Sequence, residues 1–146
     1  MNAERLEQYL HDHIPLSAAM ETEVVEVSEA GVALRAPLEP NINHRETVFG
    51  GSASALAILA AWSLVHLRLR EVGITSRIVI QRSTMDHQRP IHGSFTARSR
   101  IKDSARWERF LKGLDRKGRA RVVVEAVLES EGEVVGRFEG VFVALG

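Results

Sequence analysis

Two adjacent glycines, Gly50 and Gly51, stand just before a long uncharged segment whose composition predicts a helix. The first N–H groups of a helix have no partners within it and carry partial positive charge, and glycine lets another molecule approach them closely. Such donors can hold an oxygen on which negative charge develops during a reaction. Alternatively, the two glycines only let the chain turn into a crowded helix.

The loop before the glycines carries side chains suited to proton transfer. His44 is a candidate base near neutral pH, although it could equally be a surface histidine, one of six in the chain. Glu46 is the carboxylate nearest to the helix, and an acidic residue is also favoured there by the helix dipole alone. Asn43 either takes part in a site or folds this Pro- and Asn-rich loop as an Asx turn.

A second polar pair, Asp86 and His87, ends a predicted strand. Adjacent strand residues point to opposite faces, so at most one of the two faces a site. The simpler interpretation is a polar strand end before a turn. Ser54 and Ser63 lie outside any Gly-x-Ser-x-Gly context, which argues against a serine hydrolase.

Composition excludes several classes of function. The chain has 146 residues, enough for a single domain over 1–146, and its 19 basic residues balance 19 acidic ones. A neutral chain gives no general support for nucleic-acid binding or for an anionic membrane surface. Cysteine is absent, which excludes disulfides, thiolate metal sites and a cysteine nucleophile. The histidine spacing matches no metal motif and there is no glycine-rich phosphate loop, so we expect no metal and no cofactor.

Residues 48–67 contain no Asp, Glu, Lys or Arg and are long enough to cross a bilayer. Many of them are small or polar, so the segment is only weakly hydrophobic. It is better interpreted as a helix buried on nearly all sides in a protein. The first residues carry acidic side chains and no apolar run, unlike a secretory signal. We therefore expect a cytoplasmic protein with no membrane association.

The apolar spacing predicts two helices, a short amphipathic one at about 2–13 that Pro15 ends and a long one at about 52–72 that Gly73 stops. Residues 104–114 fit either a short helix or a strand and turn with Trp107 and Phe110 packed inward.

Alternating patterns predict six strands, of which the first two form a hairpin with Val25 and Val27 on one face. The strands are expected at 21–27, 32–36, 77–85, 95–102, 119–129 and 133–145. Consecutive, closely linked strands favour an antiparallel sheet. One strongly curved sheet wrapped around the long apolar helix would cover it, which is an α+β fold.

The run NHRETVFGGS at residues 43–52, with Trp62 partway along the helix, resembles the hotdog-fold thioesterases. It is most similar to a bacterial family of thioesterase-like proteins that also occurs fused behind acetyltransferase-like domains. The likeness extends over nearly the whole chain from about Pro15. It implies the hotdog fold, in which a curved antiparallel sheet wraps a central helix, and a homodimer with a continuous sheet, or a dimer of dimers. A free edge strand would also favour such pairing.

The resemblance further implies an acyl-thioester hydrolase of fatty acid metabolism that acts on acyl-CoA or acyl-carrier-protein substrates. Gly50 and Gly51 would form the oxyanion hole, Asn43 would orient the water, and His44 or Glu46 would activate it. Five further residues are expected to bind the substrate. These are Phe49, Ser54, Asp86, His87 and Arg89.

The sequence departs from the better-known pattern of these enzymes. Ile58 stands where many relatives carry a helix carboxylate, and no acidic residue occurs in the helix before Glu71. Phe49 stands where some relatives have a histidine. A base must therefore come from the loop or another strand. Two alternatives remain, a non-catalytic module that binds acyl groups or acyl-CoA and a hotdog dehydratase that uses His44.

A stripe of cations follows one predicted strand. Arg98, Arg100 and Lys102 share a face at period two, and Arg106 and Arg109 follow closely in sequence. They could hold the phosphates of coenzyme A or the acidic face of a carrier protein. A solvated outer face of the sheet explains them equally well.

Overall fold

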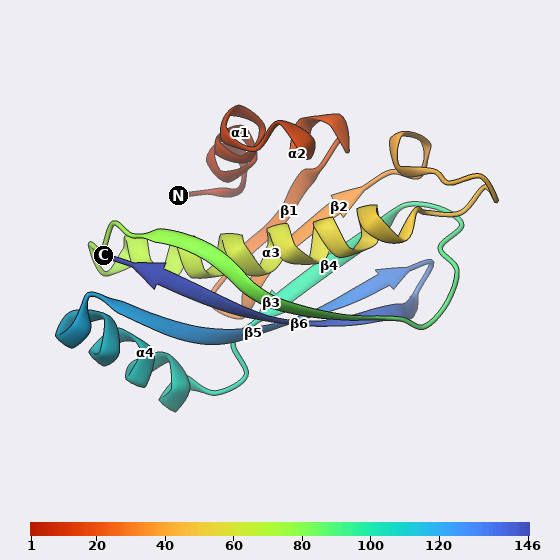
Figure 1. The fold of residues 1–146 in the computed structure, drawn as a ribbon. Helices are drawn as coiled ribbons and strands as arrows, with labels where there is room; N and C mark the ends of the chain where they lie inside the picture. The colour runs from red at the N-terminus through yellow and green to blue at the C-terminus, as the bar shows by residue number, and fades with distance from the viewer.

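The computed structural model describes residues 1–146 as a six-stranded antiparallel sheet that curves around one long helix (Figure 1). The helices are α1 (Ala3–His13), α2 (Pro15–Ala19), α3 (Gly50–Glu71) and α4 (Ser104–Lys117), with one 3-10 turn, η1 (Glu39–Asn41). The strands are β1 (Glu23–Ser28), β2 (Gly31–Ala36), β3 (Arg77–His87), β4 (Phe95–Arg100), β5 (Arg119–Ser130) and β6 (Glu133–Leu145). Their order in the sheet is β1-β2-β4-β5-β6-β3. The predicted α+β layout is confirmed.

The core is built around α3, whose alanines let the strands come close to its backbone. Ala57, Ala60 and Ala61 are fully buried, and the hydroxyl of Ser99 on β4 donates a hydrogen bond of 2.8 Å to the carbonyl of Ala60. By length and composition α3 could cross a membrane, but 61% of its apolar window is buried inside the protein. It is the core helix of this fold, as predicted.

The sheet ends in a long open edge at β3. This strand pairs only with β6, and most of its residues are exposed. Two of the exposed side chains are apolar, Val79 at 50% and Ile80 at 37%. A long edge with apolar side chains is a surface on which another strand can pair.

Residues 104–117 form a helix, so the strand-and-turn alternative for this segment is wrong. The side chain of Asp103 accepts a hydrogen bond from the N–H of Ala105, and Gly118 ends α4 in the left-handed conformation. β4 pairs with β5 only over residues 125–129. The earlier half of β5 has no strand on that side, and α4 packs beside it instead (Figure 1).

Two details of the N-terminal region differ from the expectation. α1 ends at His13, as predicted, but Pro15 also begins a new short helix because proline is favoured at the first helical position. In β1 the pairing register shifts between Val24 and Glu26, which indicates a bulge at Val25. Val24 therefore faces the core while Val25 is exposed, so the prediction that Val25 and Val27 share a face is wrong.

Two element boundaries near the predicted site are shifted. α3 begins at Gly50, two residues before the predicted start, so both glycines belong to its first turn. β3 continues to His87, two residues beyond the predicted end. These extensions bring the end of β3 to the beginning of α3.

Candidate functional site

The N-terminus of α3 presents two free backbone donors. The carbonyl of Phe49 accepts hydrogen bonds from the N–H groups of Ser52, at 2.9 Å, and Ala53, at 3.1 Å. The N–H groups of Gly50 and Gly51 have no partner in the chain, and no side chain caps the helix. The partial positive charge of the helix end is therefore available to an oxygen of a ligand.

His87 lies directly beside this helix end. It pairs in register with Gly136 on β6, and the two residues point to the inner face of the sheet, towards α3. A Cβ atom placed on Gly50 would lie 3.4 Å from Cε1 of His87 and 3.8 Å from its Nε2. The imidazole therefore stands beside Gly50, at the end of α3 that carries the two free N–H donors.

A cavity of about 320 Å³ opens at this end of the molecule. It is lined by Val48, Gly50, Ala53, His87, Gln88, Arg89, Pro90 and Ile91. Arg89 also forms an ion pair of 3.1 Å with Glu133, which holds its side chain at the rim. The structure thus brings together three of the predicted site residues, Gly50, His87 and Arg89. The other lining residues were missed because their sequence pattern is that of an ordinary strand end and turn.

The side chain of Asn43 forms its hydrogen bonds within its own loop. Its Oδ1 accepts hydrogen bonds from the N–H groups of Arg45, at 2.8 Å, and Thr47, at 3.1 Å, while its Nδ2 donates to Oγ1 of Thr47 at 2.9 Å. This arrangement matches the Asx-turn interpretation. Asn43 does not line the cavity.

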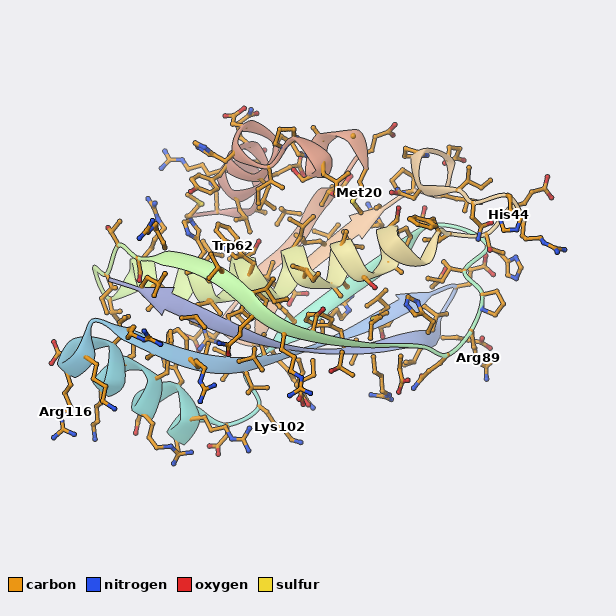
Figure 2. All side chains as sticks on the ribbon, viewed as in Figure 1. Met20, His44, Trp62, Arg89, Lys102 and Arg116 are labelled. Atoms are coloured by element: carbon orange, nitrogen blue, oxygen red, sulfur yellow. The ribbon has the colours of Figure 1, made fainter.

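His44 and Glu46 lie on the exposed outer part of the same loop, and His44 is labelled there in Figure 2. Glu46 adopts a positive φ of 65°, which completes the turn that Asn43 organises. Neither side chain lines the cavity at Gly50. The structure therefore places neither of these predicted bases in the cavity beside Gly50.

The remaining predicted substrate contacts fall in different places. The ring of Phe49 folds back over Gly51 and is 58% exposed. Ser54 is half-buried in the second turn of α3 and does not line the cavity. Asp86 points to the outer face of the sheet, in register with Arg137, so it faces away from the site.

The cation stripe on β4 is matched by acidic neighbours. Arg98 pairs with Glu129 at 2.7 Å and with Glu26 at 3.4 Å. Arg100 and Lys102 both pair with Glu125, at 3.0 Å and 3.9 Å. These exposed pairs form an ion-pair ladder on the outer face, which is the solvated-face interpretation of the stripe.

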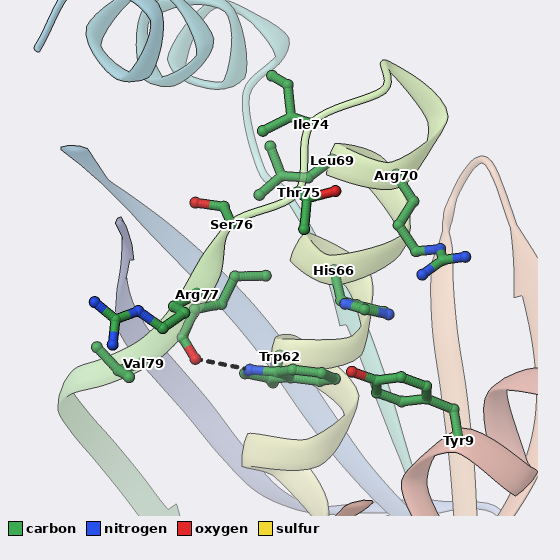
Figure 3. A pocket seen from close by; sticks show the side chains of 11 residues that line it. Tyr9, Trp62, His66, Leu69, Arg70, Ile74, Thr75, Ser76, Arg77 and Val79 are labelled. Carbon is green, nitrogen blue, oxygen red and sulfur yellow. Dashed lines mark hydrogen bonds between the residues drawn. The ribbon is translucent and has the colours of Figure 1, made fainter. Parts of the chain in front are cut away.

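A second cavity, of about 420 Å³, lies at the other end of the contact between α3 and β3 (Figure 3). The indole N–H of Trp62 donates to the carbonyl of Ile78 at 3.0 Å. The ring of His66 stacks against both Trp62, at 4.7 Å, and Tyr9 of α1, at 4.8 Å. Tyr9 and His66 were missed because contacts between α1 and α3 leave no local sequence signal.

His66 has an unusual environment in this cavity. Its Nε2 is buried and has no hydrogen-bond partner. Burial, and secondarily the charge of Arg70, lowers the pKa of His66 to about 4. The imidazole is therefore neutral at pH 7.

The chain is similar over almost its full length to one protein family and to several solved structures. Residues 3–146 match the family model described as "Putative thioesterase (yiiD_Cterm)". A Chlorobaculum tepidum protein of unknown function is 31% identical, with a TM-score of 0.92 over 98% of this chain and 93% of the other.

Two further structures carry thioesterase names. A putative thioesterase from Shewanella oneidensis is 27% identical, with a TM-score of 0.89 over 99% of this chain and 97% of the other. A probable thioesterase from Pseudomonas aeruginosa is 22% identical, with a TM-score of 0.81 over 97% and 95% of the two chains. At that lower identity the likeness shows the fold alone.

Proposed function

The chain belongs to the thioesterase family that it matches over residues 3–146 and is a thioester hydrolase of the hotdog fold, and we propose that it cleaves acyl thioesters at the cavity beside Gly50. The observation that carries this proposal is the contact between His87 and the free end of α3. This contact supports the assignment of His87 as the base and of Gly50 and Gly51 as the oxyanion donors. The acyl group is carried by coenzyme A or by an acyl carrier protein.

The reaction follows from this arrangement. The N–H groups of Gly50 and Gly51 donate hydrogen bonds to the thioester oxygen and stabilise the negative charge that develops on it. His87 removes a proton from a water as the water oxygen bonds to the carbonyl carbon. The tetrahedral intermediate collapses, the C–S bond breaks, and the imidazolium returns the proton to the leaving thiolate. The products are a carboxylic acid and a free thiol.

His87 takes the role for which the sequence offered His44 or Glu46. The absence of a helix carboxylate at Ile58 requires a base from outside α3, and His87 is the titratable side chain that lines the cavity on β3. Catalysis by His44 and Glu46 remains a prediction that the variants below test. Because His44 lies outside the cavity, a dehydratase built on it is less well supported.

The open edge of β3 supports a homodimer with a continuous sheet. β3 and α3 run in opposite directions, so His87 lies at the glycine end of α3 while Ile78 lies at Trp62. A two-fold axis near Arg82, the middle residue of β3, brings the His87 end of the partner's β3 level with Arg77. The cavity at Trp62 then faces the glycine end of the other subunit, where it can receive the acyl group. A dimer of dimers and a cytoplasmic location complete the proposal.

Release of the thiol from a panel of short, medium and long acyl-CoA substrates tests this function. A thiol reagent detects free coenzyme A without background because the chain has no cysteine. We expect turnover with at least one substrate and a loss of kcat of about 100-fold or more in His87→Gln, the scale of general-base catalysis. His44→Ala and Glu46→Gln are the matched controls and should retain most of the activity.

Two results contradict the proposal in different ways. Tight binding of acyl-CoA with no release by the wild-type protein identifies a non-catalytic acyl-binding module. Loss of turnover in His44→Ala or Glu46→Gln, with His87→Gln active, moves the base to the loop.

A further inference from the structure

A groove of about 340 Å³ runs between α4 and the first half of β5, and cations form both of its walls. The cations are Arg106, Arg109 and Lys117 on α4 and Arg119 and Arg121 on β5. All are exposed, and none forms an ion pair. No acidic side chain lines the groove, whose floor is apolar.

This local excess of positive charge is not a general property of the protein. The chain has a formal net charge of zero, and the ladder on β4 matches each of its cations with a glutamate. Glu108 and Asp115 are on α4 but do not line the groove. Unpaired cations that repel one another across a concave surface suit a ligand that carries several negative charges.

The positive surface continues towards the open edge of the sheet. Arg121 lies in register with Val143 of β6, which in turn pairs with Val79 of β3. Its Nη1 donates to Oε1 of Gln81 on β3 at 3.5 Å. Arg119 lies in register with Leu145, which pairs with Arg77, another exposed cation without an ion pair. The groove is therefore connected to β3 across one intervening strand.

We propose that this groove binds the nucleotide phosphates of coenzyme A in the thioester substrate, which rests on the proposed function. Arginine guanidinium groups bind phosphate through two parallel, charge-assisted hydrogen bonds. Facing walls on α4 and β5 can surround one compact group of several charges. The acidic helix of a carrier protein would instead need a broad open surface. The proposal therefore selects coenzyme A among the two thioester carriers.

In the proposed dimer, the distance from the groove to the partner's His87 is one that coenzyme A can span. The His87 end of the partner's β3 is then level with Arg77, and three strand spacings separate the partner's β3 from β5, about 14 Å at the usual separation of neighbouring strands. The flexible arm of coenzyme A connects its thiol to its phosphates and spans such a distance. The substrate would therefore react at one subunit while the other holds its nucleotide.

Binding of 3′-phosphoadenosine 5′-phosphate, measured by calorimetry, tests the groove without any chemistry. The double variant Arg109→Gln/Arg119→Gln should bind at least about tenfold more weakly than the wild type, because it removes two charge-assisted contacts. Lys102→Gln removes one exposed cation from the ladder and should bind like the wild type. No binding by the wild type, or equal binding by the double variant, overturns the proposal.

Kinetics separate this proposal from the proposed function. The double variant should raise KM for acyl-CoA about tenfold and leave kcat/KM for the same acyl group on N-acetylcysteamine, which has no nucleotide, unchanged. If the double variant slows only acyl-carrier-protein turnover, the groove serves the carrier protein and the inference is wrong. If the nucleotide binds as expected but no thioester is cleaved, the groove is confirmed and the proposed function fails.

Discussion

The imidazole of His87, at the end of β3, lies against Gly50, the first residue of α3, so that a Cβ on Gly50 would be 3.4 Å from His87 Cε1. That separation is an ordinary contact, so the fold leaves room for a methyl group there. The same space is where the proposed oxyanion would approach the N–H of Gly50. A substitution at Gly50 can therefore test the effect on stability and the effect on the reaction separately.

Gly50→Ala should leave stability unchanged or slightly raised and lower kcat/KM by about 10- to 100-fold. Alanine is the better helix former, but its methyl group narrows the approach to the free N–H donors. Thermal unfolding and thioester turnover, measured on the same preparation, check the two parts.

Ser52→Ala, in the same helical turn but outside the cavity, serves as the control and should keep its activity. If Gly50→Ala keeps full turnover, the N–H groups of Gly50 and Gly51 do not stabilise the oxyanion in the proposed reaction.

Asn43→Asp should be milder than Asn43→Ala. Aspartate keeps the oxygen that accepts hydrogen bonds from the N–H groups of Arg45 and Thr47. Alanine removes every hydrogen bond that the side chain at position 43 makes. Alanine should cost about 1–2 kcal/mol of unfolding free energy, and aspartate less than half of this. Chemical denaturation measures both. If Asn43 instead orients the reacting water, Asn43→Asp should be stable yet nearly inactive.

The stability of the protein should depend on pH through His66. Its pKa is about 4 in the folded state and 6.5 ordinarily, so the unfolded chain binds the proton first as the pH falls. The contribution is fully present above about pH 6.5, is lost as the pH falls towards about 4, and changes no further below that. The loss should reach about 1–2 kcal/mol, because partial exposure to water screens the effect.

His66→Phe keeps an aromatic ring against Trp62 and Tyr9 and removes the titration. The stability difference between wild type and this variant, measured at intervals from pH 4 to pH 7.5, isolates His66 from other titrating groups. A difference that stays constant over this range would contradict the neutral, buried state of His66.

Ile80→Lys should convert the proposed dimer into a monomer. The change places a charge on the open edge of β3, where Ile80 is 37% exposed, and a charged edge resists strand pairing. Light scattering coupled to gel filtration, at micromolar protein, should show the mass halved. Val25→Lys places the same charge on β1, the opposite edge of the sheet, at a side chain 36% exposed, and should remain dimeric. A wild-type protein that is already monomeric would contradict the proposed dimer.

Local patterns were enough to predict the layout of this fold. The uncharged segment at residues 48–67 can be stable only where other elements cover it, which is why the sequence predicts a central helix. The alternation in β5 and β6 fixes which faces are buried. Within residues 104–117 the same local reading left two choices open, although Asp103 and Gly118 carry the capping signals that distinguish them.

The site was less predictable because it depends on contacts between distant segments. The glycine pair was found from its spacing to the helix, whereas the choice among His44, Glu46 and His87 depends on where β3 ends. Two additional residues of strand bring His87 beside α3, and helix and strand ends are poorly defined by propensity. The ion partners of Arg98 and Arg100 come from other strands, so the sequence could not show that their charge is matched.

The bond from Ser99 to the carbonyl of Ala60 anchors the middle of α3 to the floor of the sheet. A helix held in this way cannot slide or roll to meet its substrate. In the proposed reaction the two N–H groups at its tip would be preorganised: their dipoles would be aimed before a thioester arrives, and little free energy would be lost to reorientation. In the proposed reaction, adaptation to acyl groups of different shape would then fall to the exposed Phe49 ring that covers Gly51, not to the helix beneath it.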